Sequence, residues 1–519
     1  MGALFLAYVA LARSLGVSAD AASNALQAWE MLHGNVLLRE WTLTDVSFYT
    51  NELLLFMAVE LVTGLHGDAV YFGVALTYVL VVVVTAAAAK GRARGRAGLW
   101  RMLLAVAVVA VPVAGVGVNV RFSSPNHTGT AIPLLLTWLV LDRARPQARW
   151  LPWVVSVMLG LGQLSDPLIM YIGSLPLALV CGLRMLRDRR FGGLDLWLVV
   201  AAAGSVLISQ GLQLAIRAAG GWAAHPPTVE FAEPGRLGEN LSWAVQGTAG
   251  NFGALLSERH GAWDMTLGVG HLAILLIAIL STLVVLWRGW RRQAGTPGDR
   301  VAELAALGIG VNLGAYLVST LPLDLGTARH IIAVVPLAAV LVGRVWGDRL
   351  AEVRPRWTLV CAGLLAVLVV ELGAAAITAQ RSTHAHDVAA WLKARGIDYG
   401  IGSYWYASNL TLLTGGRVRV APVIAVGSIR GYRSESRADW YDPALHDARF
   451  LVLDKGTPAF GTVPMAIEQF GVPVERHEFS GSTVLVYSHN LLVGLPAFCY
   501  PDVAPSMAEC PPHLLPLFG

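Results

Sequence analysis

Long apolar stretches recur through the first 380 residues and constrain the fold more than any other feature of the sequence. A helix needs roughly 20 predominantly apolar residues to cross the hydrocarbon layer of a membrane. The longer stretches cover residues 69–89, 103–120, 194–218, 267–287, 301–321, 331–346 and 357–378. Shorter ones cover residues 2–17, 131–141, 150–164 and 168–183. The sequence therefore predicts an α-helical polytopic membrane protein with about eleven transmembrane helices.

The composition supports a membrane protein over a soluble one. Apolar residues make up 55% of the 519 residues and charged residues only 14%, and the mean hydropathy is +0.58. A soluble protein of this length would need more charge to cover its surface. The formal charge of +4 comes almost entirely from arginine, since Lys90, Lys393 and Lys455 are the lysines. This arginine bias indicates a GC-rich bacterial gene, and no part resembles a nucleic-acid-binding patch.

Arginine clusters separate alternate pairs of apolar stretches. They consist of Arg92, Arg94 and Arg96; Arg143, Arg145 and Arg149; Arg184, Arg187, Arg189 and Arg190; Arg288, Arg291 and Arg292; and Arg349, Arg354 and Arg356. Cytoplasmic loops are enriched in Lys and Arg. This pattern predicts a multi-pass protein of the cytoplasmic membrane whose N-terminus is cytoplasmic. An odd number of spans then puts the C-terminal region outside the cytoplasm.

The start of the chain allows an alternative interpretation. Val17-Ser18-Ala19 would suit a signal peptidase, which would remove the first apolar stretch. However, residues 1–11 contain no basic residue, whereas a signal peptide begins with a positively charged segment. We therefore expect the first stretch to be retained as a span.

Residues 18–65 form the first predicted external segment. Ala22, Leu26 and Trp29 recur at helical spacing with Ala25 and Leu32, which predicts an amphipathic helix in the membrane interface that stops near Gly34-Asn35. A second interfacial stretch follows at residues 44–52. The polar residues 221–264 are predicted to form another external loop.

The sequence pattern changes after residue 380. Predicted helices at 386–394 and 406–413 alternate with predicted strands at 399–403, 418–423, 450–453 and 484–487. This alternation indicates an extracytoplasmic α/β domain over residues 380–495, after a membrane core over residues 1–379 that includes the interfacial helices of 18–65. The domain has no phosphate loop, metal motif or nucleophile motif. Residues 496–519 form a Pro-rich tail, in which Cys499 and Cys510 are predicted to form a disulfide in an oxidising compartment.

Several external carboxylates are candidate functional groups. Asp20 opens the first interfacial helix, where it could be an N-cap or a functional acid. Asp45 and Glu52 follow in the same external segment, where either could be an ordinary solvated residue. Asp166 lies in the short turn Ser165-Asp166-Pro167, whose sequence turn chemistry alone could explain.

Two arginine–histidine groups lie at predicted external ends of spans. Arg329-His330 opens the tenth span, and Arg121 and His127 flank an earlier external loop. An arginine can bind a phosphate in bidentate fashion with a charge that does not titrate. The alternative is an arginine that extends to the lipid headgroups.

The order of these features resembles the GT-C glycosyltransferases, a class that includes protein O-mannosyltransferases and the bacterial aminoarabinose transferase. The resemblance is carried by Ser18-Ala19-Asp20 after the first span, by the W-x-x-L-x-G pattern of residues 29–34, and by the second interfacial stretch to Glu52. The run Arg329-His330-Ile331-Ile332 is similar to an element that opens a late span in that class. The likeness covers most of the chain.

The resemblance implies sugar transfer from a polyprenyl-phosphate donor at the outer membrane face. By position, Asp20 would be the general base, with Asp45 as a second catalytic acid. Arg329, His330 and Arg121 would bind the donor phosphate, and Glu52, His127 and Asp166 would contact substrate. A single displacement would invert the anomeric centre. The acceptor would be a lipid, a glycan or a protein.

The sequence departs from the class at two points. Many relatives carry Asp-Glu at the first carboxylate, whereas Ala21 follows Asp20 here. The external loop 121–130 holds no carboxylate, so a metal site of the oligosaccharyltransferase type is not expected, and no cofactor is expected beyond the lipid-linked donor. The rival interpretation is a transporter or lipid flippase. Transporters often contain internal repeats, and none is evident between the halves of this chain.

Overall fold

The computed structural model describes residues 1–111, 115–145, 147–224, 229–291, 298–352, 355–496 and 498. The chain divides into two compact units. The first comprises Met1–Ala12, Val74–Leu212 and Val229–Ala379, and the second comprises Arg13–Gly73, Gln213–Thr228 and Gln380–Gly519. The segment 18–65, which was predicted to belong to the membrane core, thus lies in the same unit as the C-terminal domain.

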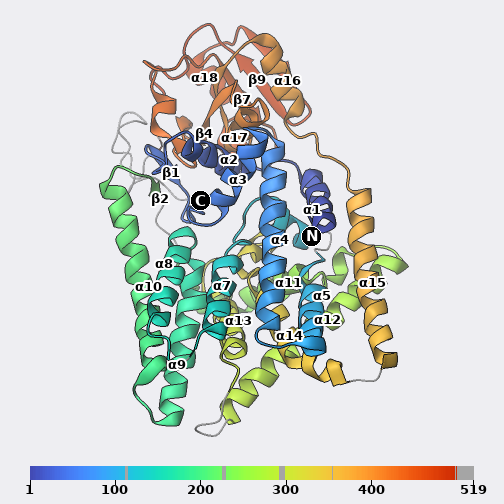
Figure 1. The fold of residues 1–519 in the computed structure, drawn as a ribbon. Coiled ribbons are helices and arrows are strands. Elements are labelled where there is room, and N and C mark those ends of the chain that lie inside the picture. Colours follow the sequence, from blue (N-terminus) through green and yellow to red (C-terminus); the bar gives the residue numbers. More distant parts are fainter. Residues whose placement is uncertain are drawn as a thin grey trace. The chain divides into compact units, whose positions relative to one another are not determined.

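The first unit is built from helices, most of which are labelled in Figure 1. They are α1 (Gly2–Leu15), α4 (Asp68–Lys90), α5 (Gly95–Val109), α6 (Val116–Phe122), α7 (Ala131–Arg143), α8 (Leu151–Ser165), α9 (Leu175–Asp188), α10 (Gly193–Ala218), α11 (Leu237–Phe252), α12 (Ala262–Arg291), α13 (Arg300–Val318), α14 (Val334–Glu352) and α15 (Pro355–Thr378). A short π-helix (Met170–Ser174) precedes α9, and a 3-10 helix (Leu325–Ile331) precedes α14.

Each predicted apolar stretch lies largely on helical residues within the described ranges, and the helices identify a multi-pass membrane protein. Five helices in the described ranges are long and apolar enough to cross a membrane, or up to seven if each of two bent helix pairs is one span. The predicted total of eleven is not confirmed. Helices α7 and α8 have only 13 and 15 residues, and the stretch 103–120 forms two helices, α5 and α6, instead of one.

The predicted external loop 221–264 contains helix α11, which the sequence analysis missed. The helix buries Asn240 and Asn251. Asn240 donates to the carbonyl oxygens of Leu317 and Ser319 at the end of α13, at 2.9 Å each. Polar residues that bond to neighbouring backbone groups made this helix look like a loop in the sequence.

Helices α5 and α14 pack at very close range in the first unit. A Cβ atom on Gly343 of α14 would lie 2.5 Å from the carbonyl oxygen of Arg101, and one on Gly347 would lie 2.8 Å from the Arg101 backbone nitrogen. These glycines form a G-x-x-x-G pattern, which lets membrane helices approach closely. Between them, Arg344 is buried and pairs with Asp299 and Asp142 at 2.8 and 3.2 Å.

The N-terminal part of the second unit contains α2 (Ala19–Leu32) and α3 (Glu52–Thr63). The helix predicted in this segment is therefore present, and it ends just before Gly34. A small sheet joins β1 (Trp41–Leu43) to β2 (Ala223–Ala224) in parallel and to β6 (Ser436–Arg437) in antiparallel fashion.

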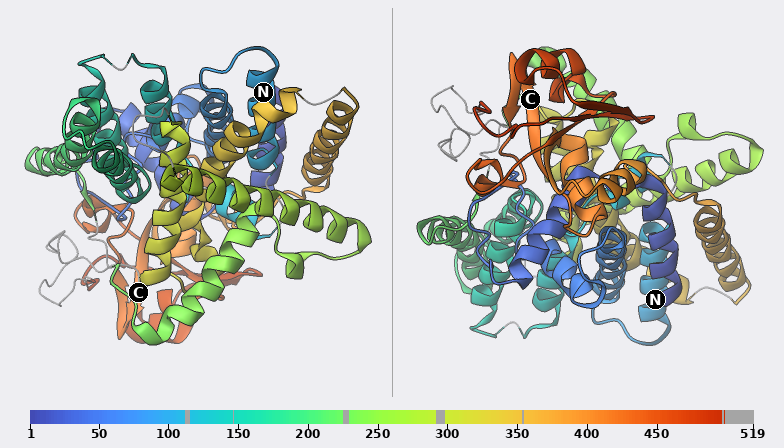
Figure 2. Two further views of the ribbon diagram at one scale, coloured as in Figure 1. Left: turned by 90° about the horizontal axis from the view of Figure 1, so that it is seen from below. Right: turned by 90° about the horizontal axis from the view of Figure 1, so that it is seen from above.

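The C-terminal part of this unit is an α/β domain, as predicted. Its six-stranded sheet has the order β5-β4-β3-β7-β9-β8, with β3 parallel to both β4 and β7. The strands are β3 (Tyr399–Ser403), β4 (Arg419–Val426), β5 (Ser428–Gly431), β7 (Phe450–Asp454), β8 (Glu475–Glu478) and β9 (Ser482–Val486). The helices are α16 (His386–Arg395), α17 (Tyr404–Leu413) and α18 (Val463–Phe470). Figure 2 gives two further views of these elements.

The predicted helices and strands of this domain are all present, β3 with the predicted bounds. The central strands β3 and β7 are buried on both faces, and β7 shows the continuous apolar pattern that predicts a strand well. The prediction missed α18 and the strands β5, β6 and β8. Strand β8 consists of charged residues and histidine, and half of its residues are exposed. Cys499 and Cys510, the predicted disulfide partners in the tail, lie outside the described residues.

Candidate functional site

Asp20 lies in the first turn of α2, but it does not cap the helix. The N-cap is Ser18, whose side chain accepts a hydrogen bond of 3.2 Å from the backbone nitrogen of Ala21. An acidic side chain in the first turn interacts favourably with the helix dipole. The interpretation of Asp20 as the N-cap of this helix is therefore wrong.

The side chain of Asp20 is hydrogen-bonded to a tyrosine of the C-terminal domain. The hydroxyl of Tyr404 lies 2.6 Å from Oδ1 of Asp20. Tyr404 is the first residue of α17 and directly follows β3, and its side chain is 2% exposed. It packs against Ala19, Tyr432 and Phe460, which fix its ring.

A second carboxylate lies on the other side of the same hydroxyl. Oε2 of Glu435 is 2.7 Å from the Tyr404 hydroxyl oxygen, and the Glu435 side chain is 2% exposed. Its backbone has a φ of 48°, in the left-handed region that side-chain-bearing residues seldom adopt. Ser23 of α2 donates to its carbonyl oxygen at 3.1 Å, which ties this strained residue to the helix that carries Asp20.

Burial and the nearby charge of Asp20 raise the pKa of Glu435 well above its ordinary value. Burial, with the two carboxylates as further causes, also raises the pKa of Tyr404. A single hydroxyl proton can be donated to only one of its two neighbours. We call Asp20, Tyr404 and Glu435 the carboxylate–tyrosine triad, and a neutral Glu435 can donate to Tyr404 while Tyr404 donates to an ionised Asp20.

The other predicted carboxylates of the second unit have different environments. Asp45 is exposed in the segment between β1 and α3. Glu52 is fully buried at the first position of α3, where the helix dipole favours a negative charge.

In the first unit, the structure brings His127, Asp166 and His330 together. Nδ1 of His127 lies 2.8 Å from Oδ2 of Asp166, and both side chains are buried. The Thr130 hydroxyl also donates to Oδ2, and the backbone nitrogen of Leu168 donates to Oδ1 at 2.9 Å. Asp166 thus holds His127 in one orientation, and the backbone φ of 60° at His127 adds local strain.

His330 and Arg329 lie on the 3-10 helix Leu325–Ile331. The His330 ring is 4.8 Å from the His127 ring, and its carbonyl oxygen accepts a hydrogen bond from Asn312. The Arg329 side chain is exposed. Its guanidinium makes no hydrogen bond or ion pair with any residue that the structure describes, so it is available to an external anion.

Arg121 has the opposite environment, although the sequence suggested the same role for both arginines. It is 3% exposed and donates to the Tyr78 hydroxyl at 2.8 Å and to the carbonyl oxygens of Gly117 and Asn251 at 2.6 and 2.5 Å. The Asn251 side chain in turn donates to the carbonyl oxygen of Ala328, next to Arg329. These bonds indicate that Arg121 supports the segment that carries Arg329.

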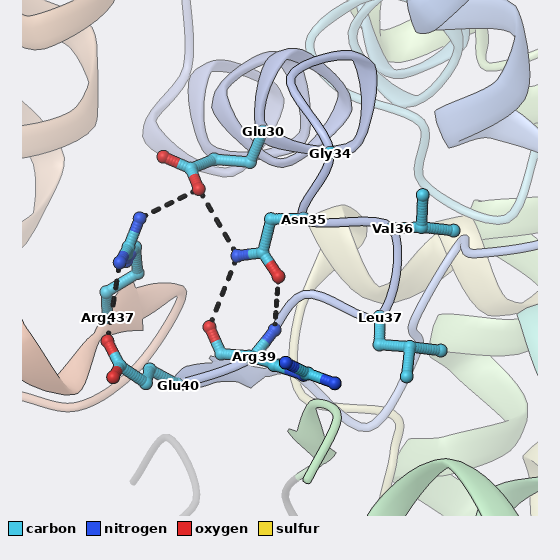
Figure 3. A pocket seen from close by; sticks show the side chains of 8 residues that line it. All are labelled: Glu30, Gly34, Asn35, Val36, Leu37, Arg39, Glu40 and Arg437. Carbon is cyan, nitrogen blue, oxygen red and sulfur yellow. Dashed lines mark hydrogen bonds and ion pairs between the residues drawn. The ribbon is translucent and has the colours of Figure 1, made fainter. Parts of the chain in front are cut away.

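The second unit also contains an open groove of about 440 Å³ near the C-terminal end of α2 (Figure 3). Glu30 accepts hydrogen bonds from Arg437 and Asn35 at 2.8 and 3.2 Å, and Arg437 also contacts Glu40. These groups satisfy one another, so the groove has the character of a surface ion-pair network.

Tyr404 and Glu435 are the residues of this site that the sequence analysis missed. Tyr404 lies at the carboxyl end of a central parallel strand, a position where ligand sites often occur, and this signal was available in the sequence. Glu435 lies in an irregular segment between β5 and β6 and has no sequence signature. No group of three or more His, Cys, Asp or Glu side chains suited to a metal ion occurs among the described residues.

No protein-family model and no curated protein matches this chain. Among solved structures, it is similar to ArnT from Cupriavidus metallidurans bound to undecaprenyl phosphate, with 15% identity and a TM-score of 0.50. The match to the same protein in the apo state has 14% identity and a TM-score of 0.54. Both matches cover 93% of this chain and 96% of ArnT. The chain therefore has the ArnT fold, as the resemblance to GT-C enzymes implied.

Proposed function

We propose that this chain is a membrane glycosyltransferase of the GT-C type, which transfers a sugar from a polyprenyl-phosphate donor to an acceptor hydroxyl. The observation that carries the proposal is the shared fold over 93% of the chain with ArnT, a protein crystallised with undecaprenyl phosphate. The carboxylate–tyrosine triad adds support, because burial and a nearby carboxylate raise the pKa of Glu435, and acids with perturbed pKa values are typical of catalytic sites.

In this proposal Asp20 is the general base, as a positioned carboxylate can be. The acceptor oxygen forms a bond to the anomeric carbon while the bond from that carbon to the phosphate oxygen breaks. The hydroxyl proton passes to the carboxylate of Asp20, and the electron pair of the broken bond leaves with the polyprenyl phosphate. One displacement of this kind inverts the anomeric centre.

We assign Arg329 to the donor phosphate, because its guanidinium is exposed and is free to form charge-assisted hydrogen bonds. A cation at the leaving phosphate stabilises the charge that develops as the glycosidic bond breaks. His330 follows Arg329 and would add a second polar group. The buried guanidinium of Arg121 supports this segment through Asn251 and Ala328 instead of binding phosphate itself.

The remaining predicted residues take supporting roles. His127 and Asp166 form a pair in which Asp166 orients the imidazole, so that the other ring nitrogen can contact substrate. Asp45 is exposed and remains the candidate for a second catalytic acid, and Glu52 a candidate substrate contact. We propose that the reaction takes place at the outer face of the cytoplasmic membrane and uses no metal ion. The acceptor is a lipid, a glycan or a protein.

The test is sugar transfer from purified polyprenyl-phosphate donors by the detergent-solubilised full chain, with Asp20→Asn as the variant. We expect turnover by the wild type and a loss of about 10²–10⁴-fold in the variant, the usual contribution of a general base. Donor binding, measured separately by quenching of intrinsic fluorescence, should be retained in Asp20→Asn. Donor binding without transfer in the wild type would contradict the enzyme and favour a transporter or flippase. Full turnover by Asp20→Asn would remove Asp20 as the base.

A further inference from the structure

The hydroxyl of Tyr404 joins two carboxylates that are otherwise far apart in the sequence. It lies 2.6 Å from Asp20 and 2.7 Å from Glu435, and both the tyrosine and the glutamate are 2% exposed. Two ionised carboxylates so close together repel each other, and the burial of Glu435 limits the screening of this repulsion by water. The hydroxyl has one proton, so the triad satisfies its hydrogen bonds only if one carboxylate carries a proton.

The surroundings decide which carboxylate carries that proton. Glu435 is more deeply buried than Asp20, which is only partly buried at the start of α2. The first turn of α2 also supplies the positive end of a helix dipole to Asp20. Burial disfavours the charged form, whereas a helix N-terminus favours it. These effects put the proton on Glu435 and the negative charge on Asp20.

We propose that Glu435 and Tyr404 are positioning residues for Asp20: neutral Glu435 donates to the Tyr404 hydroxyl, which then donates to the Asp20 carboxylate and keeps that carboxylate ionised and aimed. This inference rests on the proposed function, in which Asp20 is the general base, and extends the site to the C-terminal domain. No proton leaves the triad in this arrangement. The acceptor proton is taken up by the carboxylate of Asp20.

The titratable groups that act on the triad come from three segments. Asp20 lies on α2, Tyr404 begins α17, and Glu435 shares its segment with Tyr432. Asp20 and Glu435 help to raise the pKa of the Tyr432 phenol, although burial is the larger cause. The pKa of Glu435 is raised by burial and by Asp20, in agreement with a neutral Glu435. Tyr432 therefore stays neutral and adds no charge.

The kinetic test compares the pH dependence of kcat/KM among variants of the full chain. Tyr404→Phe should lower kcat/KM by about 10–100-fold, and it should move the acidic limb of the profile upward by about one pH unit. The shift is expected because Asp20 loses a donor to its charged form. Glu435→Leu should shift the limb in the same direction but by less, since the Tyr404 hydroxyl then loses the donor that strengthens its own hydrogen bond to Asp20.

Glu435→Gln is the decisive conservative variant. An amide has the shape of a neutral carboxylic acid and can donate to the Tyr404 hydroxyl in its place. The acidic limb of the pH profile of Glu435→Gln should stay within about half a pH unit of that of the wild type. Tyr441→Phe is the matched control, because Tyr441 is also buried and its hydroxyl lies 2.8 and 2.7 Å from two carbonyl oxygens in the same domain. It should leave the limb unmoved.

A second measurement does not depend on activity. Infrared difference spectra near pH 7 detect the carbonyl stretch of a protonated carboxyl group, which an ionised carboxylate lacks. The wild-type spectrum minus the Glu435→Gln spectrum should contain this band. The wild-type spectrum minus the Asp20→Asn spectrum should not contain it. The spectra can be interpreted even if no sugar is transferred. The hydrogen-bonded triad and the assignment as an enzyme are therefore tested independently of each other.

Four results would overturn the triad. The carboxyl band could be missing from the Glu435→Gln difference spectrum, or it could be lost with Asp20→Asn instead. Glu435→Gln could also shift the acidic limb as far as Tyr404→Phe does, which would show that Glu435 acts as a charge. A loss of rate in Tyr404→Phe with an unmoved limb would reduce Tyr404 to a structural residue.

Discussion

The hydroxyl of Tyr404 lies 2.6 Å from Oδ1 of Asp20, although 384 positions separate the two residues in the sequence. Asp20 comes from the helix that follows the first apolar stretch, and Tyr404 comes from the C-terminal α/β domain. The domain had offered no recognisable chemistry in the sequence. Its structural contribution is a buried tyrosine and a buried glutamate beside the carboxylate that the sequence singled out.

The two arginines that the sequence grouped together should respond to substitution in different ways. Arg329→Gln should raise KM for a polyprenyl-phosphate donor by about 10-fold or more, since one charge-assisted hydrogen bond contributes about 1.5–3 kcal/mol. Its melting temperature should not change, because the side chain is exposed. Steady-state kinetics with Arg217→Gln as the control would test this, because Arg217 is also exposed, near the end of α10. Equal KM values for the two variants would refute the assignment.

Arg121→Lys should instead destabilise the protein. Lysine cannot reproduce three hydrogen bonds in three directions, and the buried carbonyl oxygens of Gly117 and Asn251 would lose their donor. We expect a loss of about 2–4 kcal/mol, seen as a lower melting temperature in detergent. A stable Arg121→Lys variant with a raised donor KM would show that Arg121 binds phosphate after all.

Close packing of α5 and α14 gives a third prediction. Gly343→Ala puts a methyl group 2.5 Å from the Arg101 carbonyl oxygen, so the two helices must separate. We expect a loss of about 1–3 kcal/mol, measured by thermal unfolding in detergent. Gly310→Ala on α13 is the matched control, because a Cβ there meets nothing within 4 Å and alanine favours a helix. A Gly343→Ala variant as stable as Gly310→Ala would contradict the close approach.

Local patterns in the sequence predicted the elements well, and the contacts between distant residues poorly. Continuous apolar residues predicted α4 and the central strand β7, because a segment that is buried on all sides has a simple sequence pattern. The amphipathic pattern of residues 22–32 predicted helix α2, and Asp20 was singled out because it lies at the start of that helix. The turn chemistry of Asp166 gave no sign of His127, because that hydrogen bond spans 39 residues.

The different environments of Arg121 and Arg329 also result from contacts between distant residues. Both residues stand near the end of an apolar stretch, and their local sequences predict the same behaviour. Arg121 is buried because α6 is a separate short helix that packs against α11, a helix hidden in what looked like a polar loop. Whether an arginine meets solvent, or instead two carbonyl oxygens and a tyrosine hydroxyl, depends on that packing, which has no local signature.

Glu60 of α3 gives a prediction for the pH dependence of stability. Its side chain is 2% exposed, and its carboxyl oxygens have no hydrogen-bond partner among the described residues. Burial raises its pKa from 4.5 to about 9. The folded protein thus keeps Glu60 neutral over a range in which the unfolded chain ionises it. Between about pH 4.5 and 9 the folded state binds more protons at this residue, so stability falls as the pH rises.

The substitution Glu60→Gln should remove this contribution, because glutamine does not ionise in either state. The melting temperature of Glu60→Gln relative to the wild type should rise as the pH goes from about 5 to about 8.5, by several degrees. Glu468→Gln on α18 is the control, because Glu468 is exposed, and its difference from the wild type should not change with pH in this way. A difference in melting temperature between Glu60→Gln and the wild type that does not change with pH would contradict the prediction. It would mean that Glu60 is charged in the folded protein and contacts a cation or water there.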